Sequence, residues 1–258
     1  MSKRIVIISD TQIPYHHRKA LKAVLRFVGD YQPDEVVQIG DLVDYPQPSR
    51  WNKDSRGEFE GSVFEDSDDA KRLFLEPLRS VYDGPVKVFE GNHDERPRVY
   101  AEKYAPALAR DPRRSYHFDV LCDFDGFGVE RLPTFYRFAP GWIMTHGHKG
   151  GISLNRIAGN TALRAAVKFD KSVIMGHTHR QGILHETRGF DGDGRTLTGV
   201  EVGHLMDPKL ASKQYLKEGT ANWQMGFAVA TVDGRGVHVK NVPILSRKFE
   251  VDGEIYEV

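Results

Sequence analysis

The sequence has little cysteine and no excess of charge of either sign. It contains one cysteine, Cys122, in 258 residues, and 36 Lys and Arg balance 36 Asp and Glu. A single thiol excludes an internal disulfide and indicates a reducing compartment, so we expect a cytoplasmic protein. Zero net charge provides no overall basic field of the kind that drives sequence-independent nucleic-acid binding. A nucleic-acid partner would need a local basic patch and is not favoured.

Long apolar runs and targeting signals are also missing. No stretch approaches the roughly 18 apolar residues of a membrane span, so we expect no membrane partner. The N-terminus, MSKRIVIISD, lacks the length and cleavage site of a secretory signal peptide. Neither a P-loop nor a dinucleotide fingerprint appears. The content of 40% hydrophobic and 28% charged residues is that of a globular protein, and no linker divides the chain. We therefore predict one domain over residues 1–258.

Strands and helices are predicted to alternate in the first half of the chain. Short aliphatic runs predict buried strands at 5–8, 35–39 and 86–89. Apolar residues at helical spacing predict helices over 17–29, 64–82 and 95–109, with a kink or break at Pro77. The later chain predicts short antiparallel strands over 116–145, a helix over 154–169, and strands at 172–175, 182–187, 196–202, 227–232 and 237–242. This order indicates an α/β layered core.

Polar motifs follow five of the predicted strands. They are Asp10-Thr-Gln12, Gly40-Asp41-Leu-Val-Asp44, Gly91-Asn92-His93-Asp94, Thr145-His146-Gly147-His148 and Gly176-His177-Thr178-His179. Ligands of open α/β sheets collect at the carboxyl ends of the strands, so we expect these motifs to converge on one site. Carboxylate, carboxamide and imidazole groups suit Mn, Fe, Zn or Mg. Two such ions can clamp the attacking and leaving oxygens of a phosphoryl displacement.

The ordered set DxQ, GDxxD, GNHD, HGH and GHTH resembles the calcineurin-like metallophosphoesterases, whose usual pattern is DxH, GDxxD, GNH(D/E), H and GHxH. The resemblance covers residues 10–179 and implies an α/β fold, a four-layer α/β/β/α sandwich with two mixed sheets flanked by helices. It also implies a dinuclear metal site. The implied ligands are Asp10, Gln12, Asp41 and His179 for the first metal, and Asp41 as a bridge with Asn92, His146 and His177 for the second.

The same resemblance implies the catalytic roles. A hydroxide between the metals would attack phosphorus, with His93 near the leaving group as general acid or transition-state donor. Asp94 would orient His93. Gln12 departs from the family pattern, which usually has His there. The resemblance implies two divalent ions. Because an amide oxygen is a harder and weaker donor than imidazole, we expect Mn²⁺ to be the preferred ion, with Mg²⁺, Fe, Zn²⁺ and Ni²⁺ as alternatives. A weak or vacant first site is the other interpretation.

Residues near the motifs are candidates for contact with the substrate or for support of the metal loops. We predict that His16, His148 and Asn92 contact the substrate, and that Asp44 supports the metal loop. Tyr45 and Trp51 are placed to stack on a base or to pack. The remaining histidines have no functional prediction; they are His17, His117, His185, His204 and His238.

Together these observations predict a metal-dependent phosphoesterase. Its substrate would be a phosphodiester, or a phosphomonoester, of a nucleotide or another small phosphate ester. One alternative is a DNA exo- or endonuclease of the same superfamily, for which residues 95–114, with six basic and three acidic residues, are the visible basic segment. A protein phosphatase and a catalytically weak scaffold are the further alternatives.

Overall fold

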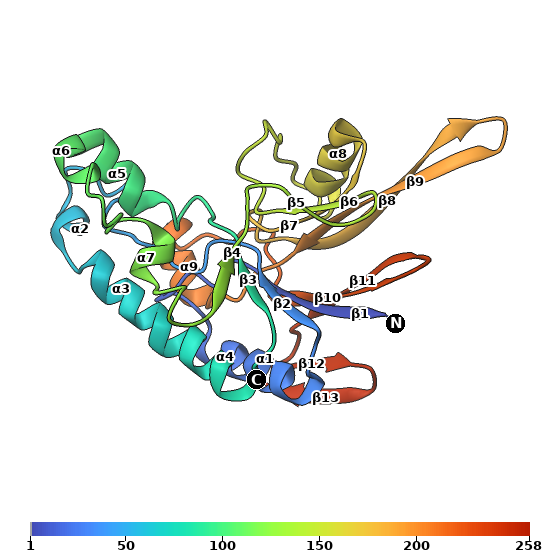
Figure 1. The fold of residues 1–258 in the computed structure, drawn as a ribbon, viewed down its shortest axis with the longest axis horizontal. Coiled ribbons are helices and arrows are strands. Elements are labelled where there is room, and N and C mark those ends of the chain that lie inside the picture. The colour runs from blue at the N-terminus through green and yellow to red at the C-terminus, as the bar shows by residue number, and fades with distance from the viewer. Residues whose placement is uncertain (1) are drawn as a thin grey trace.

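The computed structural model describes residues 2–258 and stacks two β-sheets between layers of helices (Figure 1). The first sheet has the strand order β11-β10-β1-β2-β3-β4, and the second has the order β5-β6-β7-β9-β8. The strands of the first sheet are β1 (Lys3–Ile8), β2 (Glu35–Gln38), β3 (Val86–Val88), β4 (Val129–Arg131), β10 (Gly226–Asp233) and β11 (Gly236–Pro243). The strands of the second are β5 (Tyr136–Ala139), β6 (Trp142–Thr145), β7 (Ser172–Met175), β8 (Gln181–Phe190) and β9 (Asp193–Val202).

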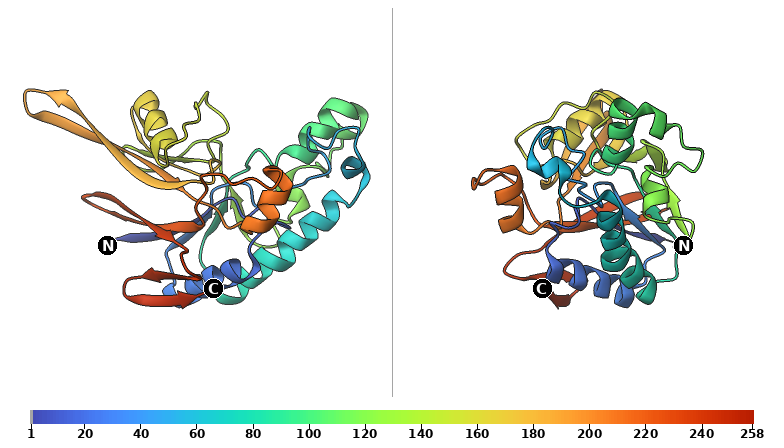
Figure 2. Two further views of the ribbon diagram at one scale, coloured as in Figure 1. Left: turned by 180° about the vertical axis from the view of Figure 1, so that it is seen from behind. Right: turned by 90° about the vertical axis from the view of Figure 1, so that its left-hand side faces the viewer.

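Both sheets are mixed. Strands β1 to β4 run parallel to one another, whereas β10 is antiparallel to β1 and β11 is antiparallel to β10. In the second sheet β6, β7 and β9 are parallel, and the edge strands β5 and β8 are antiparallel. A separate antiparallel pair comprises β12 (Lys248–Val251) and β13 (Glu254–Glu257). The long β8–β9 hairpin projects beyond the rest of its sheet (Figure 2).

The hydrophobic core lies in three layers that follow from strand alternation. In β1, Ile5 and Ile7 face the second sheet, while Val6 and Ile8 face the helices on the other side. The outer face of the first sheet packs against α1 (Arg18–Tyr31) and against the helical run over residues 63–81. The outer face of the second sheet packs against α8 (Asn160–Phe169). This is the four-layer α/β/β/α sandwich that the family resemblance implied.

The predicted helix over 64–82 is a nearly continuous run of α3 (Val63–Ala70), η1 (Lys71–Leu75) and α4 (Glu76–Val81). Pro77 does not break it. The turn before the proline is widened, because the Glu76 N–H donates to the Lys71 carbonyl five residues back. A π-type turn of this kind accommodates a residue that lacks an N–H. The predicted helix over 95–109 is divided at Ala105 into α5 (Arg96–Tyr104) and α6 (Pro106–Ala109).

Other predictions of elements need correction. Residues 116–145 were expected to be short antiparallel strands. The antiparallel pair β5–β6 confirms this for 136–145, but the earlier part contains α7 (Phe118–Leu121) and β4, which is parallel to β3. The helix expected over 154–169 begins only at Asn160, after Gly159 at a φ of 82°. The sequence did not predict α2 (Arg56–Phe59), α9 (Pro208–Tyr215) or the β12–β13 pair. Among the described residues, no helix is long and apolar enough to cross a bilayer.

Candidate active site

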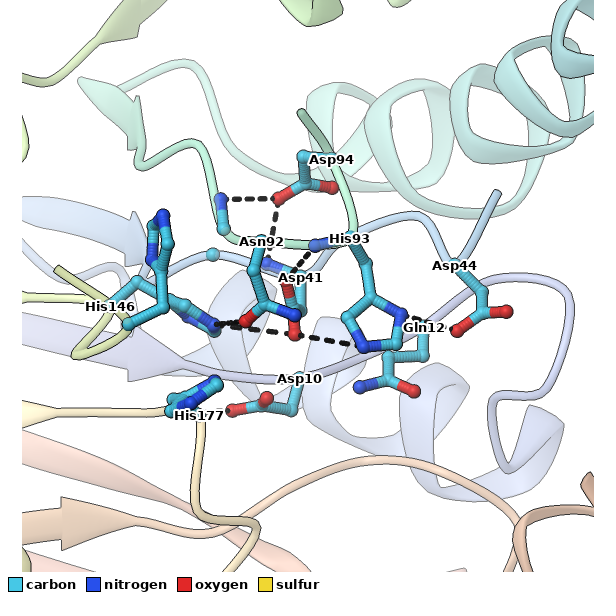
Figure 3. A network of polar contacts seen from close by, with 12 residues as sticks. Asp10, Gln12, Asp41, Asp44, Asn92, His93, Asp94, His146 and His177 are labelled. Carbon is cyan, nitrogen blue, oxygen red and sulfur yellow. Dashed lines mark hydrogen bonds and ion pairs between the residues drawn. The ribbon is translucent and has the colours of Figure 1, made fainter. Parts of the chain in front are cut away.

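The polar motifs meet at one edge of the two sheets, just past the carboxyl ends of parallel strands (Figure 3). Asp10 follows β1, Asp41 follows β2 and Asn92 follows β3. From the second sheet, His146 follows β6 and His177 follows β7. The face-to-face stacking of the sheets therefore brings residues separated by more than 160 positions into one cluster, as the strand-end rule predicts.

The backbone of the cluster is held in an unusual conformation. Asp10, Gln12, Asp41, His177 and His179 all have a positive φ, between 46° and 69°. A non-glycine residue in the left-handed region costs on the order of 1–3 kcal/mol, and such residues concentrate at functional sites. The sharp turns place short side chains over the strand ends with their polar atoms facing one another. Five such residues in one cluster indicate that this backbone conformation serves a functional site rather than core packing.

Two groups of ligand atoms in this cluster could each hold a metal ion. One group is Asp41, His146 and His177, and the other is Asp10, Asp41 and His179; within each, the ligand atoms lie within 4.8 Å of one another. Asp41 belongs to both groups, as expected of a bridging carboxylate. Its Oδ2 lies 3.3 Å from His146 Nε2, and Asp10 Oδ1 lies 3.2 Å from His179 Nε2.

Unsatisfied acceptors support a fit to divalent cations. Asp10 Oδ1, Gln12 Oε1 and Asp41 Oδ2 are buried without a hydrogen-bond donor. Buried oxygens of this kind are costly unless a donor or a cation satisfies them. The Gln12 carboxamide lies against His179, with 3.1 Å between the two Nε2 atoms, so a half-turn of the amide would present its oxygen there. Asn92 Oδ1 lies 3.2 Å from His146 Nε2, so the amide and imidazole face the same point.

The electrostatics of the cluster keep its carboxylates ionised. Burial raises the pKa of Asp41, but His146 and His93 hold it well below its usual value. Burial lowers the pKa of His146, yet Asp41 raises it to about 9. Burial, together with the neighbouring His146, lowers the pKa of His177 to about 4. His177 is therefore neutral and ready to ligate, whereas a cation would displace a proton from His146.

His93 is oriented by Asp44 and not by Asp94, which corrects the sequence prediction. The Nδ1 of His93 lies 2.6 Å from Asp44 Oδ1, and its Nε2 faces the cluster at 3.8 Å from Asp41 Oδ2. Burial lowers the pKa of His93, but Asp41 and Asp44 raise it above its usual value. The imidazole is thus held in one orientation with Nε2 directed at the cluster.

Asp94 connects two of the site's loops instead. Its carboxylate accepts hydrogen bonds from the backbone N–H groups of Asp41 at 2.7 Å, Val43 at 2.9 Å and Gly91 at 2.8 Å. The loops after β2 and β3 are therefore fastened together through one buried side chain. Their close approach also requires Gly91, since a Cβ there would overlap the Asp41 carboxylate.

Of the two histidines predicted to contact substrate, only His148 lies beside the cluster. Its ring centroid is 5.2 Å from that of His146, and burial and His146 lower its pKa to about 3. His16 instead lines a separate cavity between α1 and the run from η1 to α4, so the prediction for His16 is not supported. The reason is local: the chain turns after Gln12 and directs residue 16 toward α1, which His17 caps by accepting from the Ala20 N–H.

The two aromatics after the GDLVD motif do not border the cluster either. Tyr45 is fully buried and its hydroxyl pairs with Ser67, so it packs. Trp51 is 77% exposed and lies against the guanidinium of Arg50.

Four residues that the sequence did not mark contact the site. Arg96 donates from Nη1 to the Asp44 carbonyl at 2.7 Å and places Nη2 at 3.2 Å from His93 Nε2. The Tyr215 hydroxyl donates to Asp44 Oδ1. The others are Trp223 and His204, whose ring centroids lie 4.5 and 6.0 Å from that of His179. Arg96 directly follows the GNHDE run, a signal that could have been used, whereas the other three lie far from any motif.

The fold and the arrangement of ligands define a class of protein. A family model described as calcineurin-like phosphoesterase matches residues 3–181, and the chain belongs to this family. The family comprises hydrolases of phosphate esters and binds divalent metals. The resemblance drawn from the motifs is thereby confirmed.

Relatives of the whole chain are found among phage proteins. The gene 54 proteins of Mycobacterium phages L5 and D29 are each 57% identical to it over 258 residues, the full length of both chains. Vps29 from Cryptosporidium parvum, a solved structure, is 14% identical with a TM-score of 0.46, over 98% of this chain and 94% of that one. A predicted phosphoesterase from Streptococcus pneumoniae is 17% identical with a TM-score of 0.38, over 96% and 87%.

Proposed function

We propose that the protein is a metal-dependent phosphoesterase that hydrolyses a small phosphodiester, with a nucleotide ester as the favoured substrate. The observation that carries the proposal is the pair of ligand groups that share Asp41 and contain buried oxygens without donors. Because the cluster draws on both sheets, we also propose that residues 1–258 work as one domain. The buried free thiol of Cys122 agrees with a reducing, cytoplasmic location.

The proposed ligand set follows the two groups. Asp10, Gln12, Asp41 and His179 would hold one divalent ion, and Asp41, Asn92, His146 and His177 the other. Bound there, two divalent ions supply Lewis-acid polarisation of the phosphoryl oxygens and an activated water. Carboxylates and amides favour Mn²⁺ or Mg²⁺ at the site that contains Gln12.

The protein's own residues would then position and protonate the ester. His93, fixed through Nδ1 by Asp44, would donate a proton from Nε2 to the leaving oxygen. Arg96 places a second donor 3.2 Å from that nitrogen, so one phosphate oxygen can accept from both groups. His148 and Asn92 lie on the other side, beside His146, where they can contact the rest of the phosphate.

A small substrate is favoured because the basic segment is partly neutralised by ion pairs. Arg98 pairs with Glu95 and Glu102, and Arg114 pairs with Asp119. Two of the six cations of residues 95–114 are therefore unavailable for a nucleic-acid backbone, which weakens the nuclease alternative.

The proposal is tested by a panel of metals and model esters. We expect release of nitrophenol from bis-p-nitrophenyl phosphate in Mn²⁺, and slower release from p-nitrophenyl phosphate. Asp41→Asn should lower kcat by about 1000-fold or more and reduce the number of metals bound. Asp252→Asn makes the same chemical change at an exposed carboxylate and should match the wild type.

Two outcomes would contradict the proposal. Metal binding without turnover of any ester would favour a scaffold, and faster digestion of DNA than of the small diester would favour a nuclease. The metal preference is tested separately by calorimetric titration of wild type and Gln12→His with Mn²⁺ and Zn²⁺. We expect the histidine variant to gain affinity for Zn²⁺ relative to Mn²⁺; equal binding of both metals by both proteins would refute the preference.

A further inference from the structure

The segment between β9 and β10 borders the candidate active site with two aromatic rings. The ring centroids of Tyr215, at the end of α9, and His93 lie 6.1 Å apart. The ring centroids of Trp223 and His179 lie 4.5 Å apart, and their ring planes make an angle of 76°. The two rings are 6.4 Å apart. They therefore form a continuous wall, defined here as Tyr215 and Trp223, that reaches from the proposed proton donor to a proposed metal ligand.

The wall is anchored to the site by the main chain. The Gln224 N–H donates to the His179 carbonyl at 3.0 Å, and the Gln224 carbonyl accepts from the His204 N–H at 3.2 Å. Trp223 is thus attached directly beside the His179 loop. Its ring remains half-buried rather than packed into the core. An aromatic face that is fixed in place and still partly accessible is suited to stacking on a planar ligand.

A hollow of about 580 Å³ adjoins the wall, and Trp223 and His204 line it on the side of the cluster. Its rim carries Lys209 and Lys213, with Glu218 as the acidic lining residue. Neither lysine has a salt-bridge partner among residues 2–258. A hollow of this size accommodates a nucleoside-sized group. The two lysines favour the approach of an anionic ester to this face.

We propose that the wall and this hollow form a subsite for the base of a nucleotide ester, with the base stacked on Trp223. The inference rests on the proposed function and specifies its substrate class. The phosphoryl group would lie among Asp10, Asp41 and His179, and the nucleoside would extend over Trp223 into the hollow. From the sequence, Trp51 and Tyr45 were the candidates for stacking on a base; this proposal assigns the stacking to Trp223 instead. The whole subsite lies beyond residue 181, where the family match ends.

Binding can be measured without turnover through tryptophan fluorescence. Of the three tryptophans, Trp51 and Trp142 would be changed to Phe so that Trp223 is the remaining emitter. We expect AMP to quench this emission in Mg²⁺, and ribose 5-phosphate, which lacks the base, to leave it nearly unchanged. Equal responses to the two ligands, or none to either, would overturn the subsite.

Turnover provides the second measurement. Thymidine 5′-(p-nitrophenyl) phosphate and methyl p-nitrophenyl phosphate share a leaving group and differ in the nucleoside. We expect Trp223→Leu to lower the preference for the thymidine ester in kcat/KM by about 10-fold or more, mainly through KM. Trp223→Phe should restore part of it, since a ring remains. Trp51→Leu, at an exposed aromatic, should leave the preference unaltered.

The outcomes separate this inference from the proposed function. If both esters are hydrolysed and Trp223→Leu keeps the full preference, the subsite is wrong and the phosphoesterase proposal stands. If neither ester is hydrolysed but AMP still quenches Trp223, the subsite stands and the proposed reaction fails. A stronger response to a DNA strand than to AMP would replace the nucleotide with a nucleic-acid ligand and overturn the substrate class.

Discussion

The pairing of His93 with Asp44 leads to a quantitative prediction for Asp44→Asn. The wild-type carboxylate accepts from His93 Nδ1 at 2.6 Å and from the Tyr215 hydroxyl, and it is buried. A hydrogen bond to a charged partner contributes roughly 1.5–3 kcal/mol. If that orientation energy is expressed in the transition state, its loss lowers kcat by about 10- to 100-fold, at about 1.4 kcal/mol per decade. The size of Asn keeps the cavity filled, so the effect reports on charge.

A double-mutant cycle distinguishes orientation from a general disturbance. We expect His93→Ala alone to lose most of the turnover, and Asp44→Asn to cause little additional loss in that background, because Asp44 acts through His93. The assay is hydrolysis of bis-p-nitrophenyl phosphate at saturating Mn²⁺, with bound metal measured for all four proteins. The reasoning would be refuted if, at equal metal content, the loss of kcat in the double variant equalled the product of the losses in the two single variants. An Asp44→Asn variant with wild-type kcat would also refute it.

Further predictions concern stability and reactivity. Asp94→Asn should lower the free energy of unfolding by about 1–3 kcal/mol in chemical denaturation, because an amide NH₂ cannot accept from the backbone donors around it; an unchanged free energy of unfolding would contradict this. Gly199→Ala should destabilise by about 1–3 kcal/mol, since a Cβ would overlap the backbone of α8, whereas Gly234→Ala, with open space around it, should not. Burial raises the pKa of the Cys122 thiol to about 12, so Ellman's reagent should react with it at pH 8 only after unfolding. Burial and Asp44 raise the pKa of Asp66 to about 6, so the native state binds the proton more tightly than the unfolded state. The contribution of Asp66 to the free energy of unfolding therefore falls as pH rises from 4 to 6. Asp66→Asn should therefore stabilise the protein by about 1 kcal/mol at pH 7.5, after allowance for partial exposure, and not at pH 4; equal effects at both would refute the assignment.

The sequence was informative wherever short-range patterns carried the information. Strands β1, β2, β3 and β7 lie where aliphatic runs predicted them, within two residues of their bounds. The polar motifs after β1, β2 and β3 converge because these parallel strands end at the same edge of one sheet. That part of the geometry needs no knowledge of distant contacts, whereas the full ligand set, which draws on both sheets, was implied by the family resemblance.

The contacts of the site that the sequence did not predict join distant segments of the chain. The bond from Tyr215 to Asp44 joins residues 171 positions apart, and no pattern near either residue indicates it. For the missed elements, local signals did exist: Asp207 before Pro208 is a helix start, and it caps α9 by accepting from the Lys209 N–H. Asp252-Gly253 is likewise a hairpin turn between β12 and β13.

The choice between Asp44 and Asp94 shows why motif spacing alone leaves roles open. Both carboxylates lie near His93 in the folded chain, and both are buried. Asp94 is adjacent in sequence to His93, but the turn after β3 directs its side chain toward the backbone of the β2 loop. Asp44 reaches His93 because that same loop is held against the β3 turn. Asp94 thus positions the loop after β2, and Asp44 in that loop orients His93. The effect of Asp94 on His93 is therefore indirect and passes through the main chain. Replacing Asp94 should loosen Asp41 and Asp44 together, whereas replacing Asp44 should alter its partners His93 and Tyr215 and leave Asp41 in place.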